Sequence, residues 1–141
     1  MAFIDLTKAY DTVNREILWR HLSLLGFGGK FLRTLQAMYT GDSVTADVNG
    51  VSSKPVYLRR GLRQGCSLSP LLFNLYIAVI ADDLAALCVG YPLGNSTVSG
   101  LLFADDIVLV ADSEARLKTL VALLNQCCSE LCLSISVEIG V

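Results

Sequence analysis

The chain has 141 residues and a mass of 15.2 kDa, which suffices for one domain with its own core and leaves little room for a second. Apolar residues make up 53% and charged residues 17% of the sequence, a composition that excludes intrinsic disorder. The formal net charge of -2 excludes the basic character of most nucleic-acid-binding proteins, so any such binding must be local.

The first forty residues predict a strand followed by two helices. A short apolar run ends at Asp5. Apolar residues then recur at helical spacing over residues 13–25, which predicts a helix capped by Asp11 or Thr12. The same spacing predicts a second helix over about residues 30–39.

A β-hairpin is expected next, because the apolar period changes from helical to alternating at Val44. The dipeptide Asn49-Gly50 is a strong signal for a two-residue hairpin turn. The returning strand runs from Val51 to Leu58, and Pro55 favours an edge position for it.

The longest apolar stretch predicts a central helix from Ser69 to about Cys88, with Ser69 as cap and Pro70 at the first helical position. Asp82-Asp83 lies inside this stretch. Each aspartate costs roughly 2.5 to 3.5 kcal/mol at the centre of a bilayer, so we expect a buried core helix and no membrane partner. A solvated helix face explains this aspartate pair, to which we assign no chemistry.

The last third predicts two strands, a helix and a strand. Residues 90–100 form a connection rich in turn-forming residues, and residues 101–111 are two apolar runs that meet in a turn at Asp105-Asp106. Ser113 caps a helix that reaches about Cys132, and residues 133–139 form the last strand. This order favours an α+β fold with an antiparallel sheet and helices packed on one face.

The cysteines indicate reduced, buried thiols in a cytosolic or nuclear protein, because they form no CxxC pair and their number is odd. With one histidine in the chain, a zinc site is disfavoured, and a metal would need carboxylate ligands. The five cysteines are Cys66, Cys88, Cys127, Cys128 and Cys132.

Three aspartates, Asp5, Asp105 and Asp106, each end an apolar, strand-like run. Gathered at about 4 Å, such carboxylates would repel by roughly 4 kcal/mol per pair at an effective dielectric near 20. A hard divalent cation such as magnesium removes that repulsion. The alternative is structural: Asp105-Asp106 is then a polar hairpin turn, and Asp5 a cap on the approach to a helix.

Positive charge is concentrated between the first and the last of these carboxylates. Lys54, Arg59, Arg60 and Arg63 flank or enter the segment Gly61-Leu-Arg-Gln-Gly65, whose glycines allow backbone amides to approach a phosphate closely. The segment therefore predicts a local anion-binding surface. A solvated basic hairpin is the alternative.

Three sequence blocks together resemble the palm of reverse transcriptases, most closely those of LINE-type non-LTR retrotransposons. The first runs from Phe3 to Val13 around Asp5, the second is the Gln-Gly…Ser-Pro block within residues 61–70, and the third is Phe103-Ala104-Asp105-Asp106. The resemblance covers nearly all of the chain.

The resemblance implies an RNA-directed DNA polymerase with a ferredoxin-like palm, of which residues 1–141 are a part. Fingers would precede Met1 and the thumb would follow Val141, within a longer polyprotein. The implied partners are an RNA template, a DNA primer and deoxynucleoside triphosphates. The implied cofactors are two magnesium ions, for which manganese could substitute, that clamp the attacking primer oxygen and the leaving pyrophosphate.

The resemblance also implies a role for individual metal ligands. Asp5 and Asp105 would bridge the ions, Leu6 would offer its backbone carbonyl, and Asp106 would support the cluster or orient the primer end.

The resemblance implies a nucleotide site as well. Tyr10 matches a steric gate that excludes a 2′-hydroxyl group, and Ala104 would lie near the primer terminus. Gln64 and Gly65, beside Arg63, match the loop that contacts the incoming nucleotide.

The chain departs from the family pattern at Ile139, where a lysine is expected that helps to protonate pyrophosphate. We expect the isolated segment not to extend a primer.

Two alternatives stay open. One is a magnesium phosphohydrolase with Asp5 as nucleophile, which predicts a parallel sheet. The other is an inactive or domesticated retrotransposon remnant that binds nucleic acid or another protein.

Overall fold

The computed structural model of the protein describes residues 1–136, within which the chain forms five helices and ten strands. The helices are α1 (Ala9–Thr12), α2 (Arg15–Leu24), α3 (Gly29–Tyr39), α4 (Ser69–Ala86) and α5 (Glu114–Glu130). The strands are β1 (Ala2–Leu6), β2 (Ser43–Val44), β3 (Asp47–Val48), β4 (Val51–Ser52), β5 (Val56–Tyr57), β6 (Tyr91–Leu93), β7 (Ser96–Val98), β8 (Gly100–Phe103), β9 (Asp106–Leu109) and β10 (Ile135–Ser136).

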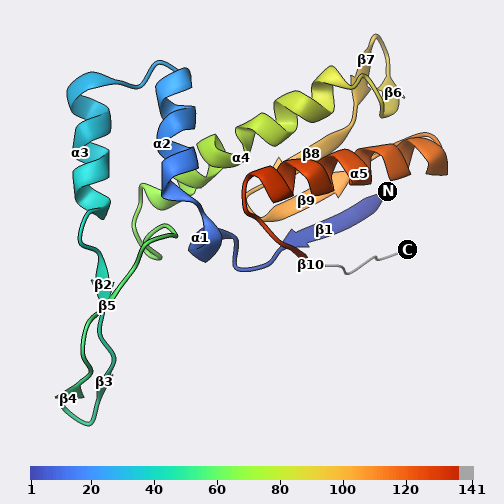
Figure 1. Ribbon diagram of the computed structural model, residues 1–141. Coiled ribbons are helices and arrows are strands. Elements are labelled where there is room, and N and C mark those ends of the chain that lie inside the picture. Colours follow the sequence, from blue (N-terminus) through green and yellow to red (C-terminus); the bar gives the residue numbers. More distant parts are fainter. Residues whose placement is uncertain (137–141) are drawn as a thin grey trace.

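The largest sheet has four strands in the order β10-β1-β9-β8, and every neighbouring pair is antiparallel (Figure 1). The remaining strands form three two-stranded sheets, all antiparallel as well. The fold class is therefore mixed α+β with small antiparallel sheets, as predicted. The parallel sheet required by the phosphohydrolase alternative is not found within residues 1–136, so that alternative is wrong.

Burial alternates along the strands of the four-stranded sheet, as expected when one face is covered and the other is open. In β9, Ile107 and Leu109 are buried, whereas Asp106 is exposed. In β1 the same alternation leaves Phe3 and Asp5 exposed. Helices α4 and α5 lie on the covered face, where α4 contacts β8 and α5 contacts β9. The carboxylates of β1 and β9 thus lie on the open face.

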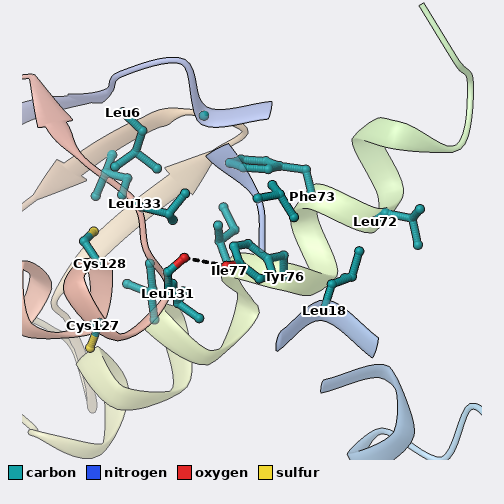
Figure 2. Packing of buried hydrophobic residues seen from close by; sticks show 14 of the residues in the cluster. Leu6, Leu18, Leu72, Phe73, Tyr76, Ile77, Cys127, Cys128, Leu131 and Leu133 are labelled. Atoms are coloured by element: carbon teal, nitrogen blue, oxygen red, sulfur yellow. Dashed lines mark hydrogen bonds between the residues drawn. The ribbon is translucent and has the colours of Figure 1, made fainter. Parts of the chain in front are cut away.

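Helix α4 forms the centre of the core, between α2 and α5. It is long and apolar enough by length and composition to cross a membrane, but Phe73 and Tyr76 on it are completely buried against the rest of the protein. The hydroxyl of Tyr76 donates to the backbone carbonyl of Leu131 (Figure 2). It also accepts from the backbone N–H of Asn14 at 3.2 Å. Burial raises the pKa of Tyr76 to about 12. This one side chain therefore ties three helices together.

Three predicted local features differ from the structure. Ser69, expected as the cap of the central helix, is the first residue of α4, and Leu68 occupies the cap position without a side-chain hydrogen bond. The helix expected from residue 13 begins at Arg15, because the side chain of Asn14, rather than Asp11 or Thr12, caps it by accepting from Glu16 N at 3.0 Å. Residues 9–12 instead form the separate turn α1. The turn predicted at Asp105-Asp106 is formed by Ala104 and Asp105, and Asp106 is the first residue of β9.

The hairpin predicted over residues 44–58 is confirmed, as two short ladders that pair β2 with β5 and β3 with β4. All of its strand residues are exposed, and it projects from the body of the molecule as an arm (Figure 1). A second hairpin, β6 with β7, lies in the segment expected to be an irregular connection. Its Pro92 and Gly94 are turn-forming residues, which concealed the short strands from sequence inspection.

The carboxyl-terminal strand is confirmed at β10, and the rest of the predicted strand, including Ile139, lies outside the described residues.

All five cysteines are free thiols. The prediction that they are buried holds for Cys127 and Cys128 but is wrong for Cys88 and Cys132, which are exposed. The last two lie in turns that end helices, where a thiol meets solvent.

Candidate functional site

Asp5 and Asp106 face each other across two central strands of the sheet. The antiparallel register of β1 and β9 pairs Asp5 directly with Asp106, although about a hundred residues separate them in the chain. Directly opposed residues on an antiparallel pair share a face, with Cβ atoms roughly 4.5 to 5.5 Å apart. The neighbouring backbone N–H of Leu6 donates to the carbonyl of Asp105 at 3.2 Å. The sheet therefore opposes Asp5 and Asp106 directly and brings the backbone of Asp105 next to Leu6.

The turn that carries Asp105 has a strained backbone. Ala104 and Asp105 form the two-residue loop between β8 and β9, and Ala104 has a φ of 51°. A positive φ costs a residue with a side chain roughly 1 to 2 kcal/mol. Backbone strain of this kind concentrates at functional sites, where the surrounding structure holds it in place.

The donor atoms of this site suit a hard divalent cation. Asp5 and Asp106 are exposed, and neither they nor Asp105 form an ion pair with any residue of the described chain. Directly opposed like charges destabilise a sheet, so a cation there would relieve repulsion. Among residues 1–136, however, no three potential metal ligands lie close enough together to hold an ion. Two carboxylates are opposed, and the Asp105 carboxylate is not gathered with them.

All sequence-predicted nucleotide-binding residues line two cavities, the first of which reaches Ala104, the residue before Asp105. One, of about 330 Å³, is lined by Tyr10 and Ala104 together with residues of α4. The other, of about 410 Å³, is lined by Tyr10, Arg63, Gln64 and Gly65. Because Tyr10 and Pro70 line both, the cavities lie side by side at the start of α4.

Tyr10 is held firmly between the two cavities. Its ring stacks on the buried ring of Phe73, with centroids 4.7 Å apart and an interplanar angle of 22°. Such aromatic contacts contribute about 0.5 to 1.5 kcal/mol beyond the area that they bury. The Tyr10 ring is therefore a fixed part of the cavity wall.

The segment Gly61–Ser69, hereafter the cavity loop, is tied to the residues around α1 at its start. Gly61 N donates to Val13 O at 2.9 Å, and Leu62 N donates to Tyr10 O at 2.8 Å. Gly61 has a φ of +86°, and a Cβ atom there would lie 2.8 Å from the carbonyl oxygen of Asp11. Only glycine fits this close approach.

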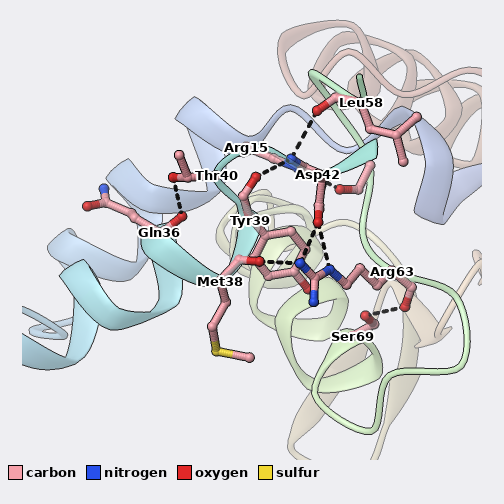
Figure 3. Close-up of polar contacts among 10 residues, drawn as sticks. Arg15, Gln36, Met38, Tyr39, Thr40, Asp42, Leu58, Arg63 and Ser69 are labelled. Carbon is pink, nitrogen blue, oxygen red and sulfur yellow. Dashed lines mark hydrogen bonds and ion pairs between the residues drawn. The ribbon is translucent and has the colours of Figure 1, made fainter. Parts of the chain in front are cut away.

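Further along the cavity loop, the two candidate side chains have protein partners. Gln64 is exposed, and its Nε2 donates to Asp11 Oδ1 at 2.9 Å. Arg63 binds Asp42 through Nε at 2.9 Å, and its Nη2 donates to the carbonyl of Met38 (Figure 3). Arg63 lines the second cavity, but its guanidinium group already binds Asp42 and the Met38 carbonyl and is not a free cation there.

Sequence inspection missed Arg15 and Asp42. The Asp42 carboxylate binds both Arg15 and Arg63, and hydrogen bonds from Arg63 foremost, with the nearby Arg15, lower the pKa of Asp42. Asp42 resembles an ordinary turn residue after Gly41. Arg15 did carry a signal, because a cation in the first turn of a helix opposes the helix dipole and so calls for a compensating partner.

The predicted basic surface is divided by the fold. Arg59 and Arg60 are exposed and line a third cavity of about 320 Å³ together with Glu16. Lys54 lies on the exposed arm, and Arg63 binds Asp42. The four cations predicted as one anion site therefore do not converge on one point.

Comparison with known proteins gives one matching family and several relatives from retrotransposons. The family described as Reverse transcriptase (RNA-dependent DNA polymerase) matches residues 1–138. The chain is 32% identical over 120 residues to the Retrovirus-related Pol polyprotein from type-2 retrotransposable element R2DM of Drosophila melanogaster, which covers 85% of this chain and 11% of that protein.

Two further relatives come from other animals. The Pol polyprotein from type-1 retrotransposable element R2 of Popillia japonica is 32% identical over 124 residues, covering 84% of this chain and 17% of that protein. The 149 kDa protein of transposon TX1 of Xenopus laevis is 31% identical over 112 residues, covering 77% of this chain and 8% of that protein. The chain thus spans less than a fifth of the length of each of these relatives.

Proposed function

Because this chain belongs to the reverse transcriptase family, we propose that it is the palm segment of an RNA-directed DNA polymerase from a non-LTR retrotransposon. In this proposal it acts within a longer polyprotein that supplies fingers and thumb. Its partners are an RNA template, a DNA primer and deoxynucleoside triphosphates.

A single observation carries the proposal: Asp5 and Asp106 are opposed on the open face of the sheet, and the turn between β8 and β9 that joins them to Asp105 also lines a cavity shared with Tyr10. Phe103 lines one cavity and pairs with Asp106, and Ala104 lines it and precedes Asp105. A nucleotide in this cavity would therefore lie beside the turn that carries Asp105.

Each residue has a distinct part in the proposed reaction. The Tyr10 ring, fixed against Phe73, bounds the space for the sugar, so that an added 2′-oxygen clashes with it. Gly65 and the backbone beside it can approach the nucleotide closely, since Gly65 has a φ of +79° and no atom within 4 Å of a Cβ position. Gln64, held by Asp11, orients this part of the loop.

Asp5 and Asp106 would hold magnesium, the ion typical of this family, and Asp105 would complete the ligand set after a rearrangement of the turn. Magnesium, when bound, offsets the charge of the carboxylates and of the phosphates. The Leu6 carbonyl is the further proposed ligand, and its residue is fixed in the sheet through the hydrogen bond to Asp105.

Primer extension tests the proposal. In a longer Pol polyprotein in which this chain replaces the matching segment, Asp105→Asn should reduce DNA synthesis on an RNA template by at least about 10³-fold, because a metal ligand is lost. The segment alone should not extend a primer.

The matched control is Asp82→Asn, which alters the other Asp-Asp pair of the chain, on the exposed face of α4. Its extension rate should equal that of the unaltered polyprotein. Full synthesis by Asp105→Asn would refute the site assignment. No synthesis by the folded, unaltered polyprotein would favour the alternative of an inactive remnant that binds nucleic acid or protein.

A further inference from the structure

The carboxylate of Asp42 joins two arginines that come from different parts of the chain. Its Oδ2 accepts from Arg15 Nη2 at 2.9 Å, and its Oδ1 accepts from Arg63 Nε at 2.9 Å. The side chains of Asp42 and Arg15 are only 9% and 10% exposed, so solvent screens their contact weakly. Asp42 is therefore the shared anion of a cluster with two cations (Figure 3).

Arg15 uses its remaining donors to bind three backbone carbonyls. Its Nε donates to Gly61 O at 2.8 Å, at the start of the cavity loop. Its Nη1 donates to Tyr39 O at 2.9 Å and to Leu58 O at 3.2 Å, at the root of the arm. One guanidinium group thus joins α3, the arm and the cavity loop.

Arg63 anchors the next part of the cavity loop to the same point. Its guanidinium binds Asp42 and the Met38 carbonyl, while its own carbonyl accepts from Ser69 Oγ at 2.6 Å. Both guanidinium groups lie over the ring of Tyr39, with Arg15 Cζ 4.8 Å and Arg63 Cζ 5.5 Å from its centroid. Two arginines so close together repel each other unless an anion lies between them.

We infer that Asp42 is a positioning residue, which holds Arg15 and Arg63 together and thereby fixes the cavity loop against Tyr10. This inference rests on the proposed function only in taking the cavity beside Tyr10 as the nucleotide site. Asp42 itself lines neither of the two cavities, so it acts through the arginines.

The test compares Asp42→Asn with Asp47→Asn in this chain. Both variants remove one negative charge near the arm, but Asp47 is exposed on β3 and its nearest hydrogen-bond partner is Ser52 at 3.4 Å. Amide hydrogen exchange is followed at Gly61 and Leu62, whose N–H groups bind α1-side carbonyls, and in α5 as a reference for global stability.

Asp42→Asn should speed exchange at Gly61 and Leu62 by about tenfold or more relative to α5, because charge-assisted hydrogen bonds contribute on that order. Asp47→Asn should change it by less than about twofold. If the Gly61 and Leu62 amides of a folded Asp42→Asn variant exchanged as slowly as those of the unaltered chain, the inference would be overturned. Amide exchange that became faster by the same factor in the cavity loop and in α5 would also overturn the inference, because it would show only a general loss of stability.

The pH dependence of Cys66 alkylation supplies a second measurement, which reports on the cavity loop itself and not on the overall stability of the chain. Cys66 lies in the cavity loop, and backbone N–H groups of Leu68 and Ser69, together with the nearby Arg63 charge, lower the pKa of its thiol. Loosening of the loop in Asp42→Asn should shift the pH profile of Cys66 alkylation upward, toward an ordinary thiol. An unshifted profile in that variant would count against the inference.

Asp42→Glu keeps a carboxylate and should restore part of the slow exchange. A measurement of magnesium-dTTP affinity for the unaltered chain and for the same variants distinguishes a failure of this inference from a failure of the proposed function. Failure of the unaltered chain to bind magnesium-dTTP would count against the proposed function, whereas local loosening in Asp42→Asn would still support the positioning role.

Discussion

Tyr10 is the residue on which the two candidate cavities converge, and its setting explains why an aromatic side chain suits that position. The ring lines both cavities and stacks on Phe73, which is itself completely buried. A smaller side chain would leave space exactly where the proposed nucleotide sugar lies. The resemblance singled out Tyr10 as a gate, but the stacking partner 63 positions later could not be read from helical spacing.

Replacement of Tyr10 therefore tests the gate. In the polyprotein carrying this chain, Tyr10→Val should raise the ratio of ribonucleotide to deoxynucleotide incorporation by about tenfold or more, because the clash with the 2′-oxygen is removed. Tyr10→Phe keeps the ring and should retain discrimination. Unchanged sugar selectivity in Tyr10→Val, measured by steady-state kinetics with both nucleotides, would rule out the gate.

Among the elements, the cavity loop depends on a close backbone approach more than on regular secondary structure. Gly61 combines a φ of +86° with a carbonyl oxygen 2.8 Å from where a Cβ would be. Gly50, in the turn of the arm, has a similar φ of +78° but nothing within 4 Å. A substitution at Gly50 therefore measures only the free-energy cost of a positive φ, whereas one at Gly61 adds the cost of the clash between the new Cβ atom and the Asp11 backbone.

We expect Gly50→Ala to lower the free energy of unfolding by about 1 to 2 kcal/mol, the cost of a positive φ. Gly61→Ala should lower it by roughly 3 kcal/mol or more, since the backbone of Asp11 must also shift. Denaturant unfolding of both variants checks this difference. Equal losses would show that the approach of Gly61 to Asp11 is not tight in solution.

Elements with long apolar patterns could be predicted from the sequence, as could the arm with its Asn49-Gly50 turn, whereas the short strands β6 and β7 could not. Helices α3, α4 and α5 lie close to their expected ranges, because many residues contribute to each pattern. Strands β6 and β7 have three residues each, too few for a period to emerge beside Pro92 and Gly94. The cap of α2 was misplaced because Asp11, Thr12 and Asn14 are all good caps.

For the whole molecule, the decisive feature is the strand order β10-β1-β9-β8, which places the first strand beside the last hairpin. The sequence predicted a shared role for the three aspartates. The strand order opposes Asp5 and Asp106 on one face, whereas Asp105 lies in the adjoining turn. The contacts of Arg15 with Asp42 and Gly61 could not be predicted, since they join residues 27 and 46 positions apart without a repeating pattern.

The open face of the sheet contributes exposed apolar side chains to a chain whose mean hydropathy is +0.55. Phe3, Leu101 and Phe103 are more than half exposed there, beside Asp5 and Asp106. An exposed apolar surface of this kind is suited to a protein segment that covers it.

Manganese binding to the purified chain, followed by electron paramagnetic resonance, tests most directly whether Asp5 and Asp106 form one cation site. The unaltered chain should bind manganese, Asp5→Asn should weaken binding at least about tenfold because one of two opposed carboxylates is lost, and Asp82→Asn should leave it unchanged. Equal affinity in Asp5→Asn and the unaltered chain, or no binding by either, would contradict a shared metal site.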